Sequence, residues 1–238
     1  MDKACPLQVI SGTPFCRFHQ DNTYEAPESE SLLEEYRYLL SIYRHCKAPA
    51  HGYRFRNLTT SPVRQVCTQQ LAFQACQFYN TIYNHDFFEQ VDFLSCQFEK
   101  SRLQTCAIDE FSFEGADISD VELHSSSLIN GNMIGSQVRS EGLKFENCTL
   151  KNIMFTGNHW KSVQFYNCDL NQVLFSDNQM DQVSFYHCDL SRVQFETNLG
   201  MTAMESTKII HSYLQPESDD FLLSRVNCSE RYPANKTK

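Results

Sequence analysis

Residues 145–195 read FENCTLKNIMFTGNHWKSVQFYNCDLNQVLFSDNQMDQVSFYHCDLSRVQF, and a large apolar residue returns at every fifth position. The set is Phe145, Leu150, Phe155, Trp160, Phe165, Leu170, Phe175, Met180, Phe185, Leu190 and Phe195. A helix repeats its faces every 3.6 residues and a strand every two, so neither keeps this period on one side. A chain that turns a corner every five residues does keep it, and such a chain winds into a solenoid.

The same period extends toward the N-terminus, after one slip. Its members are Phe73, Phe78, Tyr83, Phe88, Phe93, Phe98, Leu103, Ile108, Phe113, Ile118, Leu123, Leu128, Met133, Val138 and Leu143. From Leu143 to Phe145 the step is two residues instead of five, and Gly131, Gly135 and Gly142 gather just before it. Because glycine tolerates irregular backbone, we expect a kink, a change of register or a small loop between about residues 129 and 145.

A small or β-branched residue stands two positions before most of these apolar centres. Examples are Cys76, Val91, Cys96, Ser101, Cys106, Ala116, Val121, Ser126, Cys148, Ile153, Val163, Cys168, Val173, Val183, Cys188 and Val193, whereas Asp86, Phe111 and Glu141 are exceptions. Four pentapeptides make a coil of twenty residues, and identical residues recur at that spacing, as in Phe145, Phe165 and Phe185. Each pentapeptide is therefore expected to turn one large and one small side chain inward.

These segments resemble the pentapeptide repeat family. Cys96-Gln97-Phe98, Cys168-Asp169-Leu170 and Ala116-Asp117-Ile118 follow the family's core of a small, a polar and a large apolar residue, and the resemblance covers about residues 71–199. It implies an all-β solenoid, a right-handed, four-sided parallel β-helix. About six coils spaced by about 4.8 Å give a rod about 30 Å long. The expected interior consists of Phe73, Phe78, Phe93, Phe98, Phe113, Phe145, Phe155, Phe165, Phe175, Phe185, Phe195, Cys148, Cys168 and Cys188.

Most of the eleven cysteines fall on the small repeat position, so we read them as buried small residues and not as a disulfide scaffold. Stacked at the coil spacing, Cys148, Cys168 and Cys188 would lie within disulfide range, and we regard their oxidation as an artefact. No apolar run approaches 18 residues, so no transmembrane span is expected. The N-terminus lacks the pattern of a Sec signal, which favours a cytoplasmic protein or one exported without such a signal.

The flanks differ from the repeats. Apolar residues spaced by three and four predict an amphipathic helix over residues 29–46, either a cap on the first coil or a partner-binding helix. Residues 1–28 are expected to form a loop, and residues 47–70 look irregular, although Phe55, Leu58 and Val63 could begin poorly formed coils. Residues 201–214 are expected to form a second capping helix, followed by a flexible tail. Dimerisation through the C-terminal region is implied by resemblance alone.

Charge separates the repeats from the flanks. The net charge of the chain is −9, whereas residues 71–200 carry 17 acidic and 7 basic side chains. Because the interior is apolar, these acids must lie outside, where they repel nucleic acid and anionic membranes. They either keep the rod soluble or attract a protein surface built to hold DNA.

The sequence shows no catalytic or metal-binding motif: it has no phosphate-binding glycine loop, no His-Glu-x-x-His and no Cys-x-x-Cys. We therefore expect no cofactor and no enzyme. Resemblance to quinolone-resistance and microcin-immunity members of the family favours an interaction protein that modulates type II topoisomerase (gyrase) as a DNA mimic. The alternative is a secreted bacterial effector that binds a host protein through its repeats, with targeting information in residues 1–70. A third hypothesis, an enzyme or adaptor using the flanks, finds no supporting residues.

Overall fold

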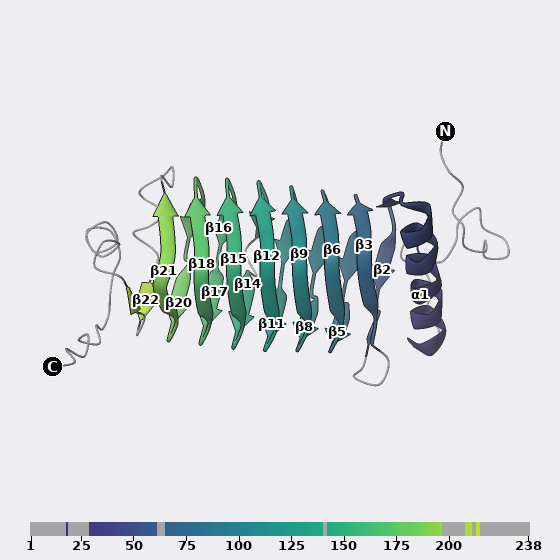
Figure 1. Ribbon diagram of the computed structural model, residues 1–238, viewed down its shortest axis with the longest axis horizontal. Coiled ribbons are helices and arrows are strands. Elements are labelled where there is room, and N and C mark those ends of the chain that lie inside the picture. Colours follow the sequence, from purple (N-terminus) through teal and green to yellow (C-terminus); the bar gives the residue numbers. More distant parts are fainter. Residues whose placement is uncertain are drawn as a thin grey trace.

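The protein is described from a computed structural model that covers Phe18 and residues 29–60, 65–139, 142–196, 208–210 and 213–214. The described chain is a parallel β-solenoid with one helix at its N-terminal end (Figure 1). Within these residues, no helix has both the length and the apolarity that a membrane crossing needs. The all-β solenoid expected from the five-residue period is confirmed.

Three parallel sheets make the walls. The wide sheet, in the order β1-β3-β6-β9-β12-β15-β18-β21-β23, consists of β1 (Ala50–His51), β3 (Cys67–Gln74), β6 (Phe87–Leu94), β9 (Ala107–Glu114), β12 (Ser127–Ile134), β15 (Thr149–Thr156), β18 (Asp169–Ser176), β21 (Asp189–Glu196) and β23 (Tyr213–Leu214). The second sheet consists of β2 (Arg54–Arg56), β4 (Gln77–Tyr79), β7 (Gln97–Glu99), β10 (Asp117–Ser119), β13 (Gln137–Val138), β16 (His159–Lys161) and β19 (Gln179–Asp181). The third consists of β5 (Ile82–Asn84), β8 (Arg102–Gln104), β11 (Val121–His124), β14 (Leu143–Glu146), β17 (Val163–Tyr166), β20 (Ser184–Tyr186) and β22 (Lys208–Ile210).

The corners explain the five-residue period. At most corners the residue two positions after the apolar centre has a positive φ, as in Ala75, Asn80 and His85. This left-handed conformation turns the chain and begins the next side. Each eight-residue strand from β3 to β18 contains one residue of positive φ, such as Gln70 or Gln90, so it bends and covers two sides of the coil. Three sheets thereby enclose a four-sided core.

The interior is built from ladders of aromatic rings. Phe165 stacks between Phe145 and Phe185, with ring centroids 4.7 and 4.8 Å apart and planes within 6° of parallel. Most residues of the expected core are buried: Phe73, Phe78, Phe93, Phe98, Phe145, Phe155, Phe165, Phe175, Phe185, Cys148, Cys168 and Cys188. Burial of each large side chain contributes roughly 1.5–3 kcal/mol.

Phe113 and Phe195 are only partly buried. Phe195 lies in β21, next to the short β23 at the C-terminal end of the stack. Phe113 borders an apolar cavity of about 50 Å³ inside the solenoid, together with smaller centres such as Leu103, Leu123 and Met133. The phenylalanine ladders are interrupted in these middle coils, and the thinner side chains leave the gap.

The slip in the period is a two-residue insertion at one corner. Asp117 pairs with Gln137 at an interval of twenty residues, whereas Val121 pairs with Leu143 at an interval of 22. The insertion therefore falls between β13 and β14, and the wide sheet continues without a break. Leu143 does not act as an apolar centre but takes the small-residue position between Val121 and Val163. The irregularity expected between about residues 129 and 145 thus lies between Val138 and Leu143.

The helix expected over residues 29–46 is confirmed as α1 (Ser29–Cys46). Leu32, Leu33, Tyr36, Leu39 and Leu40 are buried against the first coil, and the Tyr36 ring lies 5.1 Å from that of Phe55. The helix therefore closes the N-terminal end of the core, which favours its interpretation as a cap.

Parallel pairing reaches beyond the expected range of 71–199. It begins at Ala50, which pairs with Phe73, and Phe55 and Leu58 are fully buried in this first coil. At the other end, the expected helix over 201–214 is wrong where the structure describes it. Residues 208–210 and 213–214 are strands that extend two of the sheets, because parallel pairing with β20 and β21 satisfies their backbone. Val63, most of residues 1–28 and the C-terminal tail lie outside the described residues.

Candidate protein-binding face

The outer surfaces of the sheets differ in charge. Between Ala50 and Glu196, the described strands and corners of the wide sheet carry nine acidic and two basic residues, a net charge of −7. The acids are Glu89, Asp92, Asp109, Glu110, Glu114, Asp169, Asp177, Asp189 and Glu196, and the bases are Lys151 and Arg192. The described strands and corners of the second and third sheets together carry six acids and seven bases. The negative charge of the rod is therefore concentrated on one sheet.

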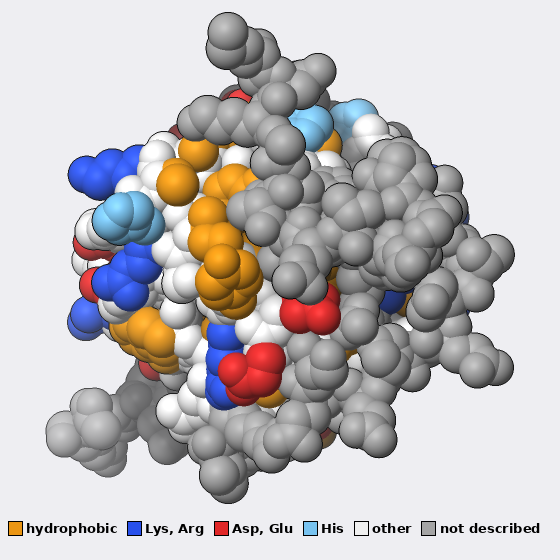
Figure 2. Space-filling view, turned by 90° about the vertical axis from the view of Figure 1, so that its right-hand side faces the viewer, with side chains coloured by type: hydrophobic (Ala, Val, Ile, Leu, Met, Phe, Trp, Pro, Cys, Tyr) orange, Lys and Arg blue, Asp and Glu red, His pale blue; other side chains and the backbone are white. Residues whose placement is uncertain are grey.

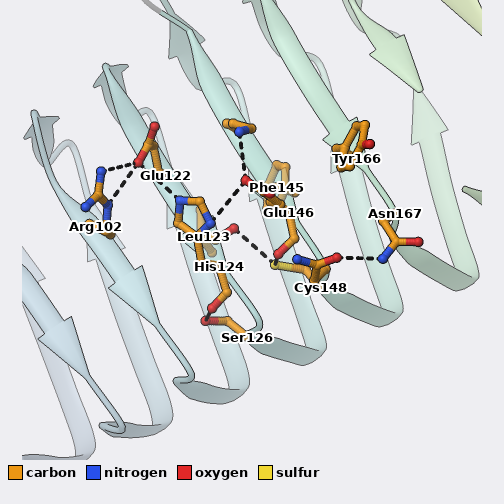
Figure 3. A network of polar contacts seen from close by, with 12 residues as sticks. Arg102, Glu122, Leu123, His124, Ser126, Phe145, Glu146, Cys148, Tyr166 and Asn167 are labelled. Atoms are coloured by element: carbon orange, nitrogen blue, oxygen red, sulfur yellow. Dashed lines mark hydrogen bonds and ion pairs between the residues drawn. The ribbon is translucent and has the colours of Figure 1, made fainter. Parts of the chain in front are cut away.

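On the third sheet, opposite charges pair across neighbouring strands (Figure 3). Arg102 donates to the Glu122 carboxylate at 2.9 and 2.5 Å, and His124 lies between Glu122 and Glu146 at 3.1 and 3.2 Å. Lys144 donates to Glu146 at 2.7 Å. Burial opposes ionisation of Glu122, but hydrogen bonds from His124 and Arg102 lower its pKa, and the hydrogen bond from Lys144 lowers that of Glu146.

This network neutralises its own charge and has the properties of a surface ion-pair ladder. Its side chains are roughly 27–51% exposed, and both acid pKa values move away from neutrality, unlike those of a general acid or base. Among the described residues, no group of three His, Cys, Asp or Glu side chains is placed to hold a metal ion. The second sheet shows similar pairing: Arg139 donates two hydrogen bonds of 2.7 and 2.5 Å to the Asp117 carboxylate.

Several acids on the wide sheet accept hydrogen bonds from neutral amide side chains. Gln69 donates to Glu89 at 2.7 Å, and Gln90 donates to Glu110 at 2.7 Å. Asn130 donates to Asp109 at 3.1 Å. An amide donor holds a carboxylate in place without cancelling its charge. These side chains therefore keep the outward field of the wide sheet negative.

The cysteines have a role that sequence reasoning missed. Each buried thiol donates to a backbone carbonyl of the preceding coil, as in Cys148 to Leu123 at 3.3 Å and Cys188 to Phe165 at 3.4 Å. Ser101, Asn158 and Asn178 donate to corresponding carbonyls. The small position thus selects a short hydrogen-bond donor as well as a small volume. Cys148, Cys168 and Cys188 are free thiols in one column.

Asp86, the acidic exception at the small position, closes the first coil. Its side chain is buried and accepts hydrogen bonds from the Thr60 hydroxyl, from Val66 N at 2.5 Å and from Asn84 N at 3.1 Å. Burial raises its pKa, and these three donors oppose that effect. Because its carboxylate oxygens accept these hydrogen bonds locally, Asp86 links Thr60 to Val66.

The α1 end offers a different kind of surface. Figure 2 looks onto this end, where hydrophobic side chains form a band beside Lys, Arg and His. Tyr38 is 58% exposed on α1, and a groove of about 270 Å³ between α1 and β3 is lined by Arg37, Arg44 and Cys67, among others. Arg37 is engaged by Glu34 and by the Gln65 carbonyl at 2.8 and 3.1 Å. The groove is lined by two arginines and no acid, so it lacks the negative charge of the wide sheet.

Comparisons with known proteins found similar solved structures, all at low sequence identity. No family model and no curated protein matches the chain. Among solved structures, trypsin-treated M102R QnrB1, a plasmid-mediated fluoroquinolone resistance protein, is 19% identical, with a TM-score of 0.46 over 74% of this chain and 90% of that chain. Full-length QnrB1 is 17% identical (TM-score 0.43, 72% and 89% covered). HetL, a pentapeptide repeat protein involved in heterocyst differentiation regulation from a Nostoc cyanobacterium, is 8% identical (TM-score 0.37, 74% and 89% covered).

Similarity at these identities and TM-scores gives no information about what the chain binds. The assignment rests on the chain itself: a large apolar residue at every fifth position, a left-handed corner two residues later and parallel coils that enclose a four-sided core. By these features, the chain is a four-sided parallel β-solenoid built from five-residue repeats.

Proposed function

We propose that the protein is a non-catalytic interaction protein whose wide sheet binds a basic protein surface, most concretely the DNA-binding surface of type II topoisomerase. The observation that carries the proposal is the uneven charge of the rod: −7 on the wide sheet against a near balance on the other two. A surface that only served solubility would need no such concentration on one side.

The mean linear density of this charge supports mimicry of DNA. From β6 to β21 the wide sheet advances by five strand spacings, which is about 24 Å at about 4.8 Å each. Seven net charges over that length give one charge per about 3.4 Å, which is the spacing of phosphates along one strand of B-DNA. Summed over the two sides of the coil that the wide sheet covers, its mean linear charge density is therefore similar to that of one DNA strand.

The same field argues against other partners. A face of this sign repels nucleic acid and anionic lipid, so the proposed partner is a protein. The proposal has the protein act in the cytoplasm, where such a target works. We do not extend it to the effector hypothesis, because residues 29–60 are taken up by the cap and the first coil.

The experiment is a titration of the protein into gyrase supercoiling of relaxed plasmid, with and without a fluoroquinolone. Inhibition at micromolar concentration, or protection of the plasmid from drug-induced cleavage, is the expected result. An unchanged supercoiling rate and unchanged cleavage across the titration would refute the topoisomerase proposal. The search would then move to other basic proteins that bind the wide sheet.

A further inference from the structure

Exposed hydrophobic side chains gather on the same sheet as the acids. Of six large hydrophobic residues that are exposed in the described chain, four lie on the wide sheet: Phe87, Leu94, Ile134 and Met154, at 38, 37, 40 and 48%. The remaining two are Tyr38 on α1 and Tyr166 on the third sheet. Single exposed apolar residues are ordinary on protein surfaces, but their concentration on one charged sheet needs a cause.

The acids leave the middle of the wide sheet free. One acidic cluster lies on β6 and β9 and consists of Glu89, Asp92, Asp109, Glu110 and Glu114. The other lies on β18 and β21 with the corner that follows β18, and consists of Asp169, Asp177, Asp189 and Glu196. The two strands between them, β12 and β15, carry no acidic residue.

The middle instead carries a strip of apolar side chains. Met154 on β15 pairs directly with Leu174 on β18 and, on its other side, with Asn132 on β12. Ile134 is two residues beyond Asn132 on the same face of β12, so it lies diagonally next to Met154. Ile134, Met154 and Leu174 thus form a continuous apolar strip across three neighbouring strands. Its first member pairs with Glu114 of the first acidic cluster.

We propose that this apolar strip is the energetic centre of the binding face, and that its occupant is a protein with an exposed apolar side chain between two basic patches. The inference rests on the proposed function and adds to it the chemistry of the contact. From β9 to β18 there are three strand spacings, so the two basic patches of the partner lie about 14 Å apart.

The acids and the apolar strip contribute to binding in different ways. The acids lie at the two ends, where they stay solvated and attract the basic partner over a distance. The strip lies between them, where a docked partner removes water from Ile134 and Met154, and desolvated central residues dominate binding energy. A second copy of this chain is a poor occupant, because two wide sheets of net charge −7 repel each other.

The test uses two synthetic peptides of equal charge. Each has two tri-lysine clusters separated by four residues, which span about 14 Å in an extended chain. One peptide has Leu-Phe at its centre, and the other has Ser-Ser. Fluorescence anisotropy at constant ionic strength measures their dissociation constants for the full chain, for a variant with Ile134→Thr and Met154→Gln, and for Tyr166→Thr. Tyr166 is a matched control, because it is 42% exposed but lies on the third sheet.

The Leu-Phe peptide is expected to bind at least about fivefold more tightly than the Ser-Ser peptide. The double variant should abolish that ratio while leaving the Ser-Ser affinity unchanged, and Tyr166→Thr should preserve it. Equal affinity of both peptides for the unaltered chain, or an unchanged ratio in the double variant, overturns the inference. The gyrase assay is separate: a protein that ignores gyrase but shows the ratio refutes the topoisomerase target and retains the strip.

Discussion

Replacing Gly131 by alanine would place a methyl group inside the ring of Phe111. A Cβ built on Gly131 lies 2.5 Å from Phe111 Cδ1 and closer still to Cε1 and Cζ. Phe111 stands at the small-residue position, where the preceding coil has Val91 and the coil after Gly131 has Ile153. The Phe111 ring is too large for this position alone, and Gly131, twenty residues later, leaves space for it.

Gly131→Ala is expected to destabilise the protein, whereas glycine-to-alanine substitutions in extended backbone usually stabilise one. Glycine to alanine in extended backbone ordinarily stabilises by about 0.4–1 kcal/mol, because the unfolded chain loses freedom. Here the ring is buried and confined by Phe113, with centroids 5.7 Å apart, so the added methyl group overpacks the core. Overpacking costs about 1–3 kcal/mol, so we expect Gly131→Ala to lower the free energy of unfolding by about 2 kcal/mol.

A second substitution, Phe111→Val, completes a double-mutant cycle with Gly131→Ala. In a variant that also carries Phe111→Val, the clash is gone, and valine is the residue that Val91 and Val173 place in this column. Urea unfolding of the four proteins, followed by far-UV circular dichroism, gives the coupling free energy, expected at about 2 kcal/mol. A Gly131→Ala protein as stable as the unaltered chain would refute the reasoning, and so would strictly additive substitutions.

Three further predictions concern the core. Phe165→Ala removes a fully buried ring from the middle of a stack, and thermal unfolding should show a loss of about 3–5 kcal/mol. Because burial raises the pKa of Asp86 above its ordinary 3.8, the unfolded chain ionises first, so folding stability falls as the pH rises from there to the folded pKa. Denaturant titrations from pH 3 to 7 should show this fall relative to Asp86→Asn, and parallel curves would contradict it. Burial raises the pKa of Cys106 to about 12, so a thiol reagent at pH 8 should label exposed Cys46 and Cys67 first, and Cys106 only after unfolding.

The sequence predicts the solenoid and the first helix well, because their packing is local and periodic. The five-residue period of Phe145 to Phe195 is a direct record of which side chains face inward, and the apolar face of residues 29–46 belongs to a helix that packs on the first coil. The period also assigns each acid of the repeats to a side of the coil. The concentration of charge on the wide sheet could therefore have been derived by sorting acids such as Glu89 and Asp109 by position.

Other features depend on contacts between distant residues. The start of the solenoid at Ala50 is hidden, because the period is interrupted between Thr60 and Thr68, where Asp86 instead secures the chain. The short pattern at residues 208–214 is compatible with helix or strand, and pairing with β20 and β21 favours the strand. Ile134 and Met154 stand at outward positions, so against the inward period they look like irregularities. Their juxtaposition appears only when the strands are aligned.

The central claim is that the charge of the wide sheet, and not the total charge, makes the protein bind. It is tested by gyrase supercoiling inhibition with two charge-matched variants. One replaces Glu89, Asp109 and Glu110 of the wide sheet by their amides, and the other replaces Glu99, Asp120 and Asp181 of the second sheet and its corner. We predict that the first variant raises the half-inhibitory concentration by about tenfold or more and the second leaves it nearly unchanged. Equal effects of the two variants would contradict the account.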